Sequence, residues 1–335
     1  YEKMRYAPAN PWHPDADRLG LSEGHAVPII YAAIAVLGGA VGNSREQPIT
    51  LTSAELLNLR ARASVLDGHP NPAEGFPFFD AATGSLGQGL SVAAGLGCAA
   101  MLDGSPRRIY CLVGDGESRE GQIWEAADFI AERGLKNVVT ILNANAHGQA
   151  GPVSGQQSPE RLAAKLAAFG FNVITIDGHD VDAIRAALDF VGQPKQPLAT
   201  VAKTVKGWGV EPFLTGNWHG KPLGNAELDA GLKSLDGKLP TDGASERLGP
   251  PPAPATGGTF KRVDPAEVKW PSFAEALQMA GMGKLLEKGL IGTRRAYGAA
   301  LKVAGDLLPQ VVAVDGDVSN STIVEVFAKS HPERF

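Results

Sequence analysis

The segment RIYCLVGDGESREGQIWEAADFIAER, residues 108–133, contains the clearest structural signal in the chain. The apolar run from Arg108 to Val113 predicts a buried strand, and the spacing of apolar residues from Glu120 to Arg133 predicts a helix. Two glycines flank an acid between them, in Gly114-Asp115-Gly116. A strand, a glycine-rich turn and a helix are the parts of a parallel α/β sheet, which binds ligands beyond the carboxyl ends of its strands.

The same alternation continues along the chain. Short apolar runs predict strands at residues 138–142, 172–176 and 198–201, and longer amphipathic runs predict helices at 159–169 and 181–191. Two stretches rich in Ala and Gly, residues 22–39 and 87–102, are typical of buried helices. The pattern as a whole predicts an α/β fold with a parallel sheet and helices on both faces.

A change of composition divides the chain. Residues 236–270 are rich in Pro, Gly, Asp and Ser, which is typical of a linker or a crossing segment without its own core. We therefore predict a first domain at residues 1–235 and the beginning of a second α/β domain at 271–335, with a helix at Thr293–Leu307 and a strand at Val311–Val314.

Composition argues against several classes of partner. The formal net charge is −5, so there is no basic field to gather nucleic acid or anionic lipid. No apolar run reaches the length of about 18 residues that a membrane span needs, and no signal peptide is visible, so we expect a cytoplasmic protein. Cys98 and Cys111 lie among apolar or small residues, which predicts two reduced core thiols.

Two oxygen-bearing side chains are placed to share a cation. Asp115 follows one predicted strand, and Asn145 follows the next, about thirty residues later. The helix after Asp115 offers amide groups and a positive dipole end to a diphosphate. A hard divalent cation with phosphate oxygens prefers oxygen ligands of this kind.

This pattern resembles the fingerprint of thiamine-diphosphate enzymes, in which GDG is followed about thirty residues later by Asn. The resemblance implies that Asp115, Asn145 and the backbone carbonyl of His147 hold Mg²⁺, with Ca²⁺ and Mn²⁺ as alternatives, against the diphosphate of the cofactor. The imidazole of His147 need not touch the metal.

Five further segments narrow the resemblance to the transketolase family, and their order and spacing cover essentially the whole chain. They are LSEGHA (21–26), LDGHP (66–70), TGSLGQG (83–89), KTVKG (203–207) with WHGKP (218–222), and GTRRAYG (292–298). Membership would imply a thiamine-diphosphate transferase that moves a two-carbon ketol unit from a ketose phosphate to an aldose phosphate. It would also imply a homodimer with the active site at the subunit interface.

The resemblance gives roles to individual residues. His25 and His219 would lie near the diphosphate and the reacting carbonyl, and His69 would contact sugar hydroxyls; all three suit proton transfer near neutral pH. The remaining cofactor contacts would come from Gly84, Ser85, Leu86, Gly116, Glu117, Asn145 and Lys206. Arg294 and Ser321 match positions that bind the phosphate end of the substrate, although Ser321 could equally cap a helix.

The chain also departs from the family pattern. Glu23 occupies a position where some relatives carry Lys, and Ala146 replaces an Arg. Glu120 and Glu125 match family acids at the subunit contact, with surface solvation as the alternative. His13, His179 and His331 receive no role.

Two family motifs are expected outside this chain. The family acid that faces the aminopyrimidine is expected beyond Phe335, and an early Gly-His-Pro motif is expected upstream of the first residue. We therefore expect the chain to be a truncated form of a longer protein.

Two alternative functions remain open at this point. One is another thiamine-diphosphate ketolase, such as deoxyxylulose-phosphate synthase, dihydroxyacetone synthase or a dehydrogenase E1 component. The other is a non-catalytic, cofactor-binding subunit of a split enzyme.

Overall fold

A five-stranded parallel sheet forms the centre of the computed structural model, which describes residues 2–193, 195–236, 238, 250–258, 260–289 and 291–335. The strand order is β1-β4-β5-β7-β6, and every neighbouring pair is parallel. The strands are β1 (Arg18–Leu21), β4 (Ile109–Gly114), β5 (Val138–Ala144), β6 (Asn172–Asp177) and β7 (Leu198–Lys203). A short antiparallel pair, β2 (Ala40–Val41) and β3 (Ile49–Thr50), lies outside this sheet. The predicted α/β fold class is confirmed.

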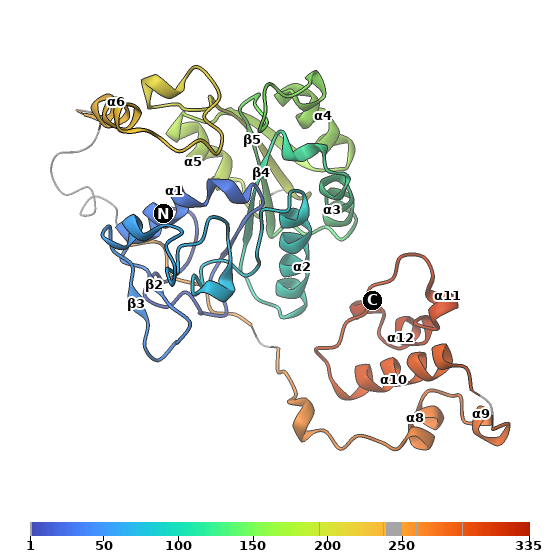
Figure 1. The fold of residues 1–335 in the computed structure, drawn as a ribbon. Helices are drawn as coiled ribbons and strands as arrows, with labels where there is room; N and C mark the ends of the chain where they lie inside the picture. The colour runs from blue at the N-terminus through green and yellow to red at the C-terminus, as the bar shows by residue number, and fades with distance from the viewer. Residues whose placement is uncertain (1, 194, 237, 239–249, 259, 290) are drawn as a thin grey trace. The chain divides into compact units, whose positions relative to one another are not determined.

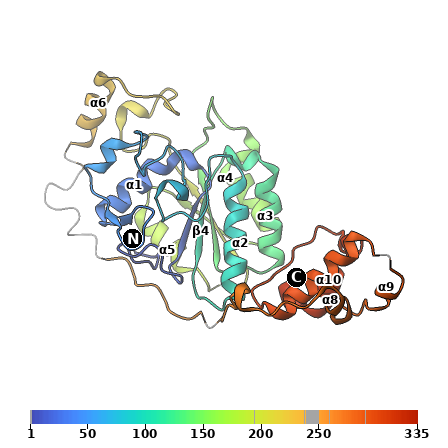
Figure 2. The ribbon, with the colours of Figure 1, turned by 60° about the horizontal axis from the view of Figure 1, so that its bottom comes forward.

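Helices cover both faces of the sheet. Figures 1 and 2 show α2 (Gln88–Leu102), α3 (Gly121–Glu132) and α4 (Pro159–Ala168) on one side, with α1 (Val27–Val36) and α5 (Val181–Asp189) on the other. Buried residues of α2, α3 and α4 share one hydrophobic cluster with the central strands. The three central strands are therefore apolar along most of their length, as is typical of parallel strands covered on both faces.

A glycine allows α2 to lie close to the sheet. A Cβ added to Gly97 would stand 2.3 Å from Cγ2 of Val138, at the start of β5. Side chains pack at van der Waals distances of about 3.5–4.0 Å, so the helix could not approach this closely with a larger residue. The abundance of Gly and Ala in this helix thus follows from its contact with β4 and β5.

The chain divides into two compact units, residues 1–258 and 259–335. The boundary falls within the predicted linker, of which residues 237, 239–249 and 259 lie outside the described residues. The part that follows, residues 250–258, belongs to the first unit, where the Pro252 carbonyl accepts a hydrogen bond from the Tyr6 amide at 2.9 Å. The domain limits at residues 235 and 271 stay a prediction.

The second unit is helical in its described part. Its helices are α8 (Phe273–Met279), α9 (Lys284–Glu287), α10 (Thr293–Leu307), α11 (Ser319–Thr322) and α12 (Glu325–Ser330).

The remaining described elements are a further helix and short 3₁₀ turns. The first unit also contains α6 (Asn225–Leu235). Single 3₁₀ turns occur at residues 24–26, 55–58, 72–74, 117–119, 155–157, 211–213, 265–267 and 332–334.

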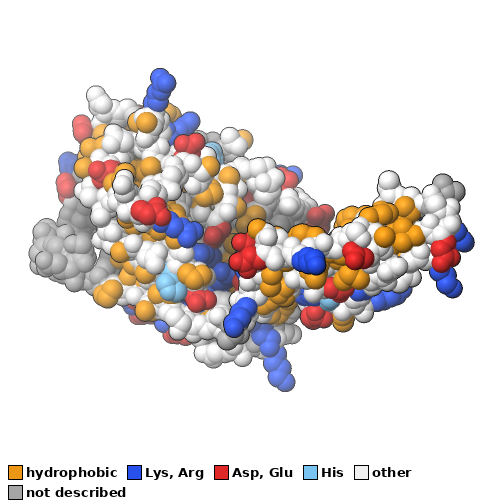
Figure 3. Space-filling model, turned by 90° about the horizontal axis from the view of Figure 1, so that it is seen from below, with side chains coloured by type: hydrophobic (Ala, Val, Ile, Leu, Met, Phe, Trp, Pro, Cys, Tyr) orange, Lys and Arg blue, Asp and Glu red, His pale blue; other side chains and the backbone are white. Residues whose placement is uncertain are grey.

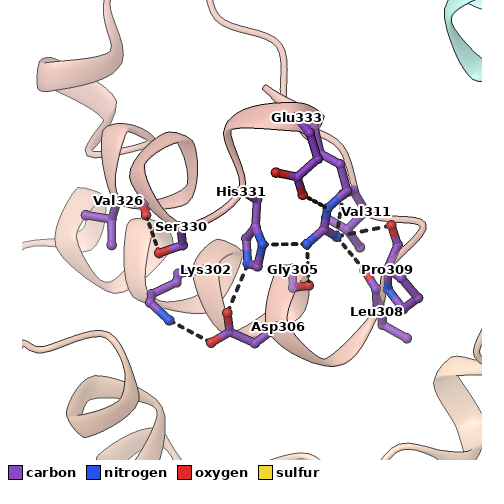
Figure 4. A network of polar contacts seen from close by, with 11 residues as sticks. Lys302, Gly305, Asp306, Leu308, Pro309, Val311, Val326, Ser330, His331 and Glu333 are labelled. Atoms are coloured by element: carbon purple, nitrogen blue, oxygen red, sulfur yellow. Dashed lines mark hydrogen bonds and ion pairs between the residues drawn. The ribbon is translucent and has the colours of Figure 1, made fainter. Parts of the chain in front are cut away.

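A polar network fixes the end of α10 against the last residues of the chain (Figure 4). The Arg334 guanidinium donates to the carbonyls of Gly305 and Leu308, which α10 leaves without partners in its own helix. It also donates to Nδ1 of His331 at 2.5 Å, while Nε2 of His331 bonds Asp306 at 2.9 Å. Since Nδ1 accepts, the ring carries its proton on Nε2 and donates it to the carboxylate. His331 therefore has a structural role.

Three expectations about local structure were wrong. Residues 311–314 form no strand, because no other described segment of the second unit is a strand that could pair with them. Helix α1 begins only at Val27 and is not buried all round, since Ile29 is 66% exposed. Ser321 is not a helix cap, because it lies within α11. Of the two thiols, Cys111 is buried as expected, and Cys98 is half-buried; both are free.

On the face seen in Figure 3, acidic and basic side chains are interspersed among hydrophobic and uncharged surface. Among the described residues, no helix is both long enough and apolar enough to cross a membrane.

Candidate functional site

A cavity of about 890 Å³ opens in the first unit beside the segments that follow β4, β5 and β7. It is the position at which parallel sheets bind ligands, and its size suits a small-molecule cofactor. Eleven of the fourteen predicted site residues line it: His25, His69, Gly84, Leu86, Asp115, Gly116, Glu117, Asn145, His147, Lys206 and His219. Ser85, also predicted to bind the cofactor, is exposed and is not among the lining residues.

Asp115 is held rigidly at the base of this cavity. Gly114 at the end of β4 pairs with Asn143 of β5, so the residues that follow the two strands emerge side by side. The Asp115 carboxylate is 1% exposed and accepts hydrogen bonds from the amides of Gly116 at 2.7 Å and Ala146 at 2.6 Å. Burial raises its pKa above the ordinary value, and the amide donors oppose that shift. Among the described residues, Asp115 forms no ion pair.

Ala146 has a backbone conformation that accounts for part of this geometry. Its φ is +63°, in the left-handed region, and this turn directs its amide to Asp115. The same turn contains Asn145, whose Oδ1 accepts from the His147 amide at 2.9 Å. Asn145 Oδ1 retains a second lone pair, so the turn offers the cavity an amide oxygen and a neighbouring carbonyl.

Glu117 is a buried residue at the wall of the cavity, and its carboxylate bonds to the protein itself. Its carboxylate is 3% exposed and accepts from Ser22 Oγ at 2.5 Å, from the Gly87 amide at 2.8 Å and from the Gly114 amide at 3.0 Å. These donors belong to the ends of β1 and β4 and to the start of α2. Glu117 therefore ties three segments together, and its contact with the cofactor stays a prediction.

The three predicted histidines converge. The rings of His25 and His219 lie 4.5 Å apart between centroids. Burial and, to a smaller degree, the nearby His219, Lys206 and His69 together lower the pKa of His25 to about 4, so His25 is neutral at pH 7. Lys206 Nζ lies 3.0 Å from Nδ1 of His219. An ammonium only donates, so His219 accepts at Nδ1 and keeps its proton on Nε2.

The ring of His69 rests on Gly84. A Cβ at Gly84 would lie 2.6 Å from Cδ2 of His69, and the φ of +119° also requires glycine here. The segment that carries His69 is anchored by Tyr31, whose hydroxyl donates to the Asp67 carbonyl at 3.0 Å. Two predicted motifs, at residues 66–70 and 83–89, thus meet through one histidine and one glycine.

Comparison with known proteins places the chain in a family. Residues 1–241 match the sequence profile described as "Transketolase, thiamine diphosphate binding domain". The chain belongs to the transketolase family. Human transketolase is 39% identical over 341 residues, covering 100% of this chain and 49% of the human protein. Transketolase-like protein 2 of Bos taurus is 37% identical over 338 residues, covering 100% of this chain and 50% of that protein.

The chain spans about half the length of the curated relatives it matches. Among solved structures, the transketolase of Campylobacter jejuni superposes with a TM-score of 0.71 at 24% identity, covering 96% of this chain and 52% of that one. At this identity the likeness shows the fold alone. It agrees with the parallel sheet and flanking helices described above.

The two predicted substrate-phosphate residues lie in the other unit of this transketolase-family chain. Arg294 and Ser321 line a cavity of about 460 Å³ together with Tyr297, Asp315 and Thr322. The structure thus places both residues on one cavity, and their role in binding phosphate stays a prediction. Glu120 and Glu125 are exposed on the first unit.

Two aromatic rings that line the cavity received no role in the sequence analysis. His179 and Trp208 both face the cavity, and their rings stack with centroids 4.3 Å apart and planes 10° from parallel. One signal could have found His179: it follows the predicted strand at 172–176, just as Asp115 follows its own strand, and parallel strands end at the same edge.

Glu23, which departs from the family pattern, is part of a hydrogen-bonded chain. Thr204 Oγ1 donates to Asn143 Oδ1 at 2.6 Å, and Asn143 Nδ2 donates to Glu23 Oε1 at 3.0 Å. Glu23 is 4% exposed. Burial raises its pKa to about 7; the Asn143 hydrogen bond opposes the shift, and the charges of Glu117 and Asp115 add to it.

We expect Glu23→Gln to stabilise the protein at pH 8 and to have little effect near pH 4.5. A raised pKa means that Glu23 contributes stability below its unfolded-state pKa of 4.5, and that this contribution is lost as the pH rises through about 7. Gln cannot ionise and still accepts from Asn143. The gain at pH 8 should be roughly 2–3 kcal/mol. Urea denaturation at several pH values measures it, and a difference that does not change with pH would contradict the assignment.

Proposed function

We propose that the first unit binds thiamine diphosphate with a divalent cation in the cavity beside Asp115, and that the protein is a transketolase. The observation that carries this proposal is that Asp115, Asn145 and Lys206 line one cavity together with three of its histidines, His25, His69 and His219. The family profile, which is named for thiamine diphosphate binding, supports it independently.

The donor set fits the proposed cofactor and metal. Asp115, Asn145 and the His147 carbonyl offer the hard oxygen ligands that Mg²⁺ prefers. No group of three or more His, Cys, Asp or Glu suited to a metal occurs in the described part of the chain. In the proposed site Asp115 would be the one carboxylate ligand, and phosphate oxygens and water would complete the shell. Lys206, half-buried beside Asp115, would meet the diphosphate as a point charge.

The side chains then suggest how the reaction proceeds. When bound, thiamine diphosphate would supply the carbon nucleophile and the electron sink for ketol transfer. His219, with its proton on Nε2, would donate to a substrate oxygen, and neutral His25 would accept a hydroxyl proton and return it. His69, fixed against Gly84, would orient a sugar hydroxyl. Leu86, exposed at the cavity, would support the bent cofactor.

We propose sugar phosphates as substrates, recognised at their phosphate end by Arg294 and Ser321. The transketolase of Pichia stipitis, whose fold this chain shares, has been solved in complexes with fructose 6-phosphate and with sedoheptulose 7-phosphate. A planar guanidinium suits a phosphate group. We also propose a homodimer, which would cover apolar side chains such as Ile29 and Leu86.

Two measurements on the complete product of the gene test the proposal. Isothermal titration calorimetry should show binding of thiamine diphosphate that requires Mg²⁺. An assay with xylulose 5-phosphate as donor and ribose 5-phosphate as acceptor should then show ketol transfer. Absence of cofactor binding would overturn the assignment of the cavity. Cofactor binding without ketol transfer would overturn the transketolase activity alone.

A further inference from the structure

His179 forms a clasp at one wall of the cavity. It follows β6, and its own amide donates to Asp177 Oδ1 at 2.9 Å, which sets its direction. Its Nε2 accepts a hydrogen bond from the Val205 amide at 2.8 Å. The ring also stacks on Trp208, three residues beyond Val205. One imidazole thus holds two points of the segment that follows β7.

Lys206 and Gly207 lie between these two points, and Lys206 is the one that carries a charge. Its Nζ lies 3.0 Å from His219 Nδ1 and 3.4 Å from the Gly148 carbonyl, so it reaches the cavity from a fixed backbone. A lysine side chain has four rotatable bonds, so ordering it costs conformational entropy. When the backbone on both sides of Lys206 is already fixed, ligand binding loses less conformational entropy.

The local sequence makes this clasp possible. Gly178, before the histidine, has no room for a side chain, since a Cβ would lie 2.5 Å from Thr204 Cγ2. The Gly178 amide donates to the Lys203 carbonyl at 2.7 Å. The turn after β6 and the turn after β7 are therefore in backbone contact, which brings His179 within reach of Val205.

We propose that His179 is a positioning residue, which clasps residues 205–208 and so holds Lys206 in place for the diphosphate group. This inference rests on the proposed function, because it takes Lys206 to be the diphosphate contact. The lone pair on Nε2 is essential to the clasp, since only an unprotonated ring nitrogen accepts from an amide. Trp208, which is 60% exposed, keeps the ring from turning away.

Calorimetric titration of the complete protein with thiamine diphosphate and Mg²⁺ tests the inference. His179→Leu removes the acceptor and should weaken binding about tenfold, the equivalent of one hydrogen bond. His179→Gln retains an acceptor and should recover most of the affinity. Trp208→Ala, at an exposed position, should weaken binding about threefold even if the leucine variant folds poorly. His13→Leu is the matched control, because Nδ1 of His13 also accepts from an amide, that of Asp15 at 3.1 Å, but His13 does not line the cavity.

The outcomes are distinguishable with Lys206→Met as a reference. If that variant loses affinity while His179→Leu and Trp208→Ala bind like the wild type, the clasp is wrong and the proposed function stands. If Lys206→Met also binds like the wild type, Lys206 is not the diphosphate contact and the inference falls with it. A glutamine variant as weak as the leucine variant would also overturn the role of the Nε2 acceptor.

Discussion

Asp115→Asn is expected to abolish the Mg²⁺-dependent binding of thiamine diphosphate, with an affinity loss of about a hundredfold or more. The substitution keeps the size of the side chain but removes the negative charge that a divalent cation requires. It also turns an NH₂ group toward one of two amide donors, those of Gly116 and Ala146, which now bond the carboxylate. Both effects act against the bound state, and calorimetric titration at several Mg²⁺ concentrations measures their sum.

Asp180→Asn is the matched control for this experiment. Asp180 also accepts two backbone amides, those of Asp182 and Ala183, at the start of α5. Asn caps helices as well as Asp does, so this variant should bind the cofactor normally. Cofactor binding by Asp115→Asn with wild-type affinity would show that the cation is held elsewhere, and the assignment of the cavity would then have to be abandoned.

Elements with strong periodicity could be predicted closely from the sequence. The strand expected at 108–113 is observed at Ile109–Gly114, and the helix expected at Thr293–Leu307 is observed with the same bounds. In both segments the apolar residues fall on the faces that pack against neighbouring elements. The spacing of apolar residues therefore predicts the element. Local sequence is sufficient where burial and periodicity agree.

Elements that depend on a distant partner could not be predicted. Strand β1 has only four residues, and its backbone becomes a strand through pairing with β4, in which Arg18 lies opposite Ile109. Nothing in the sequence Arg-Leu-Gly-Leu marks that pairing. The apolar run at 311–314 shows the reverse case, because it has the composition of a strand but no strand beside it in the described part of its unit.

The candidate site shows the same division. The motifs around His25, His69, Asp115 and His219 could be assembled because each matches a family pattern, and the structure places all four residues on one cavity. The clasp formed by His179 could not be predicted in this way. It depends on a turn after β6 meeting a turn after β7, and that contact arises only when the strands are ordered in the sheet.

Glu117 offers the second large expected effect, and it concerns folding. Replacement by Ala would leave three donors unpaired, those of Ser22, Gly87 and Gly114, in a buried position. We expect a loss of about 3–5 kcal/mol in the free energy of unfolding, because each buried donor left without a partner costs about 1–3 kcal/mol. Urea denaturation without cofactor measures this loss independently of binding.

The comparison with Glu125→Ala separates this role from the cofactor contact that the family resemblance implied. Glu125 is exposed on α3, so its removal should change stability by less than about 0.5 kcal/mol. The contradicting result is a Glu117→Ala variant that is as stable as Glu125→Ala but binds thiamine diphosphate weakly. Glu117 would then be a direct contact to the cofactor, and its hydrogen bonds to the ends of β1 and β4 and the start of α2 would not contribute to the free energy of unfolding. We expect the opposite order, because all three hydrogen bonds of this carboxylate come from the protein itself, and its burial leaves no other group to satisfy these donors.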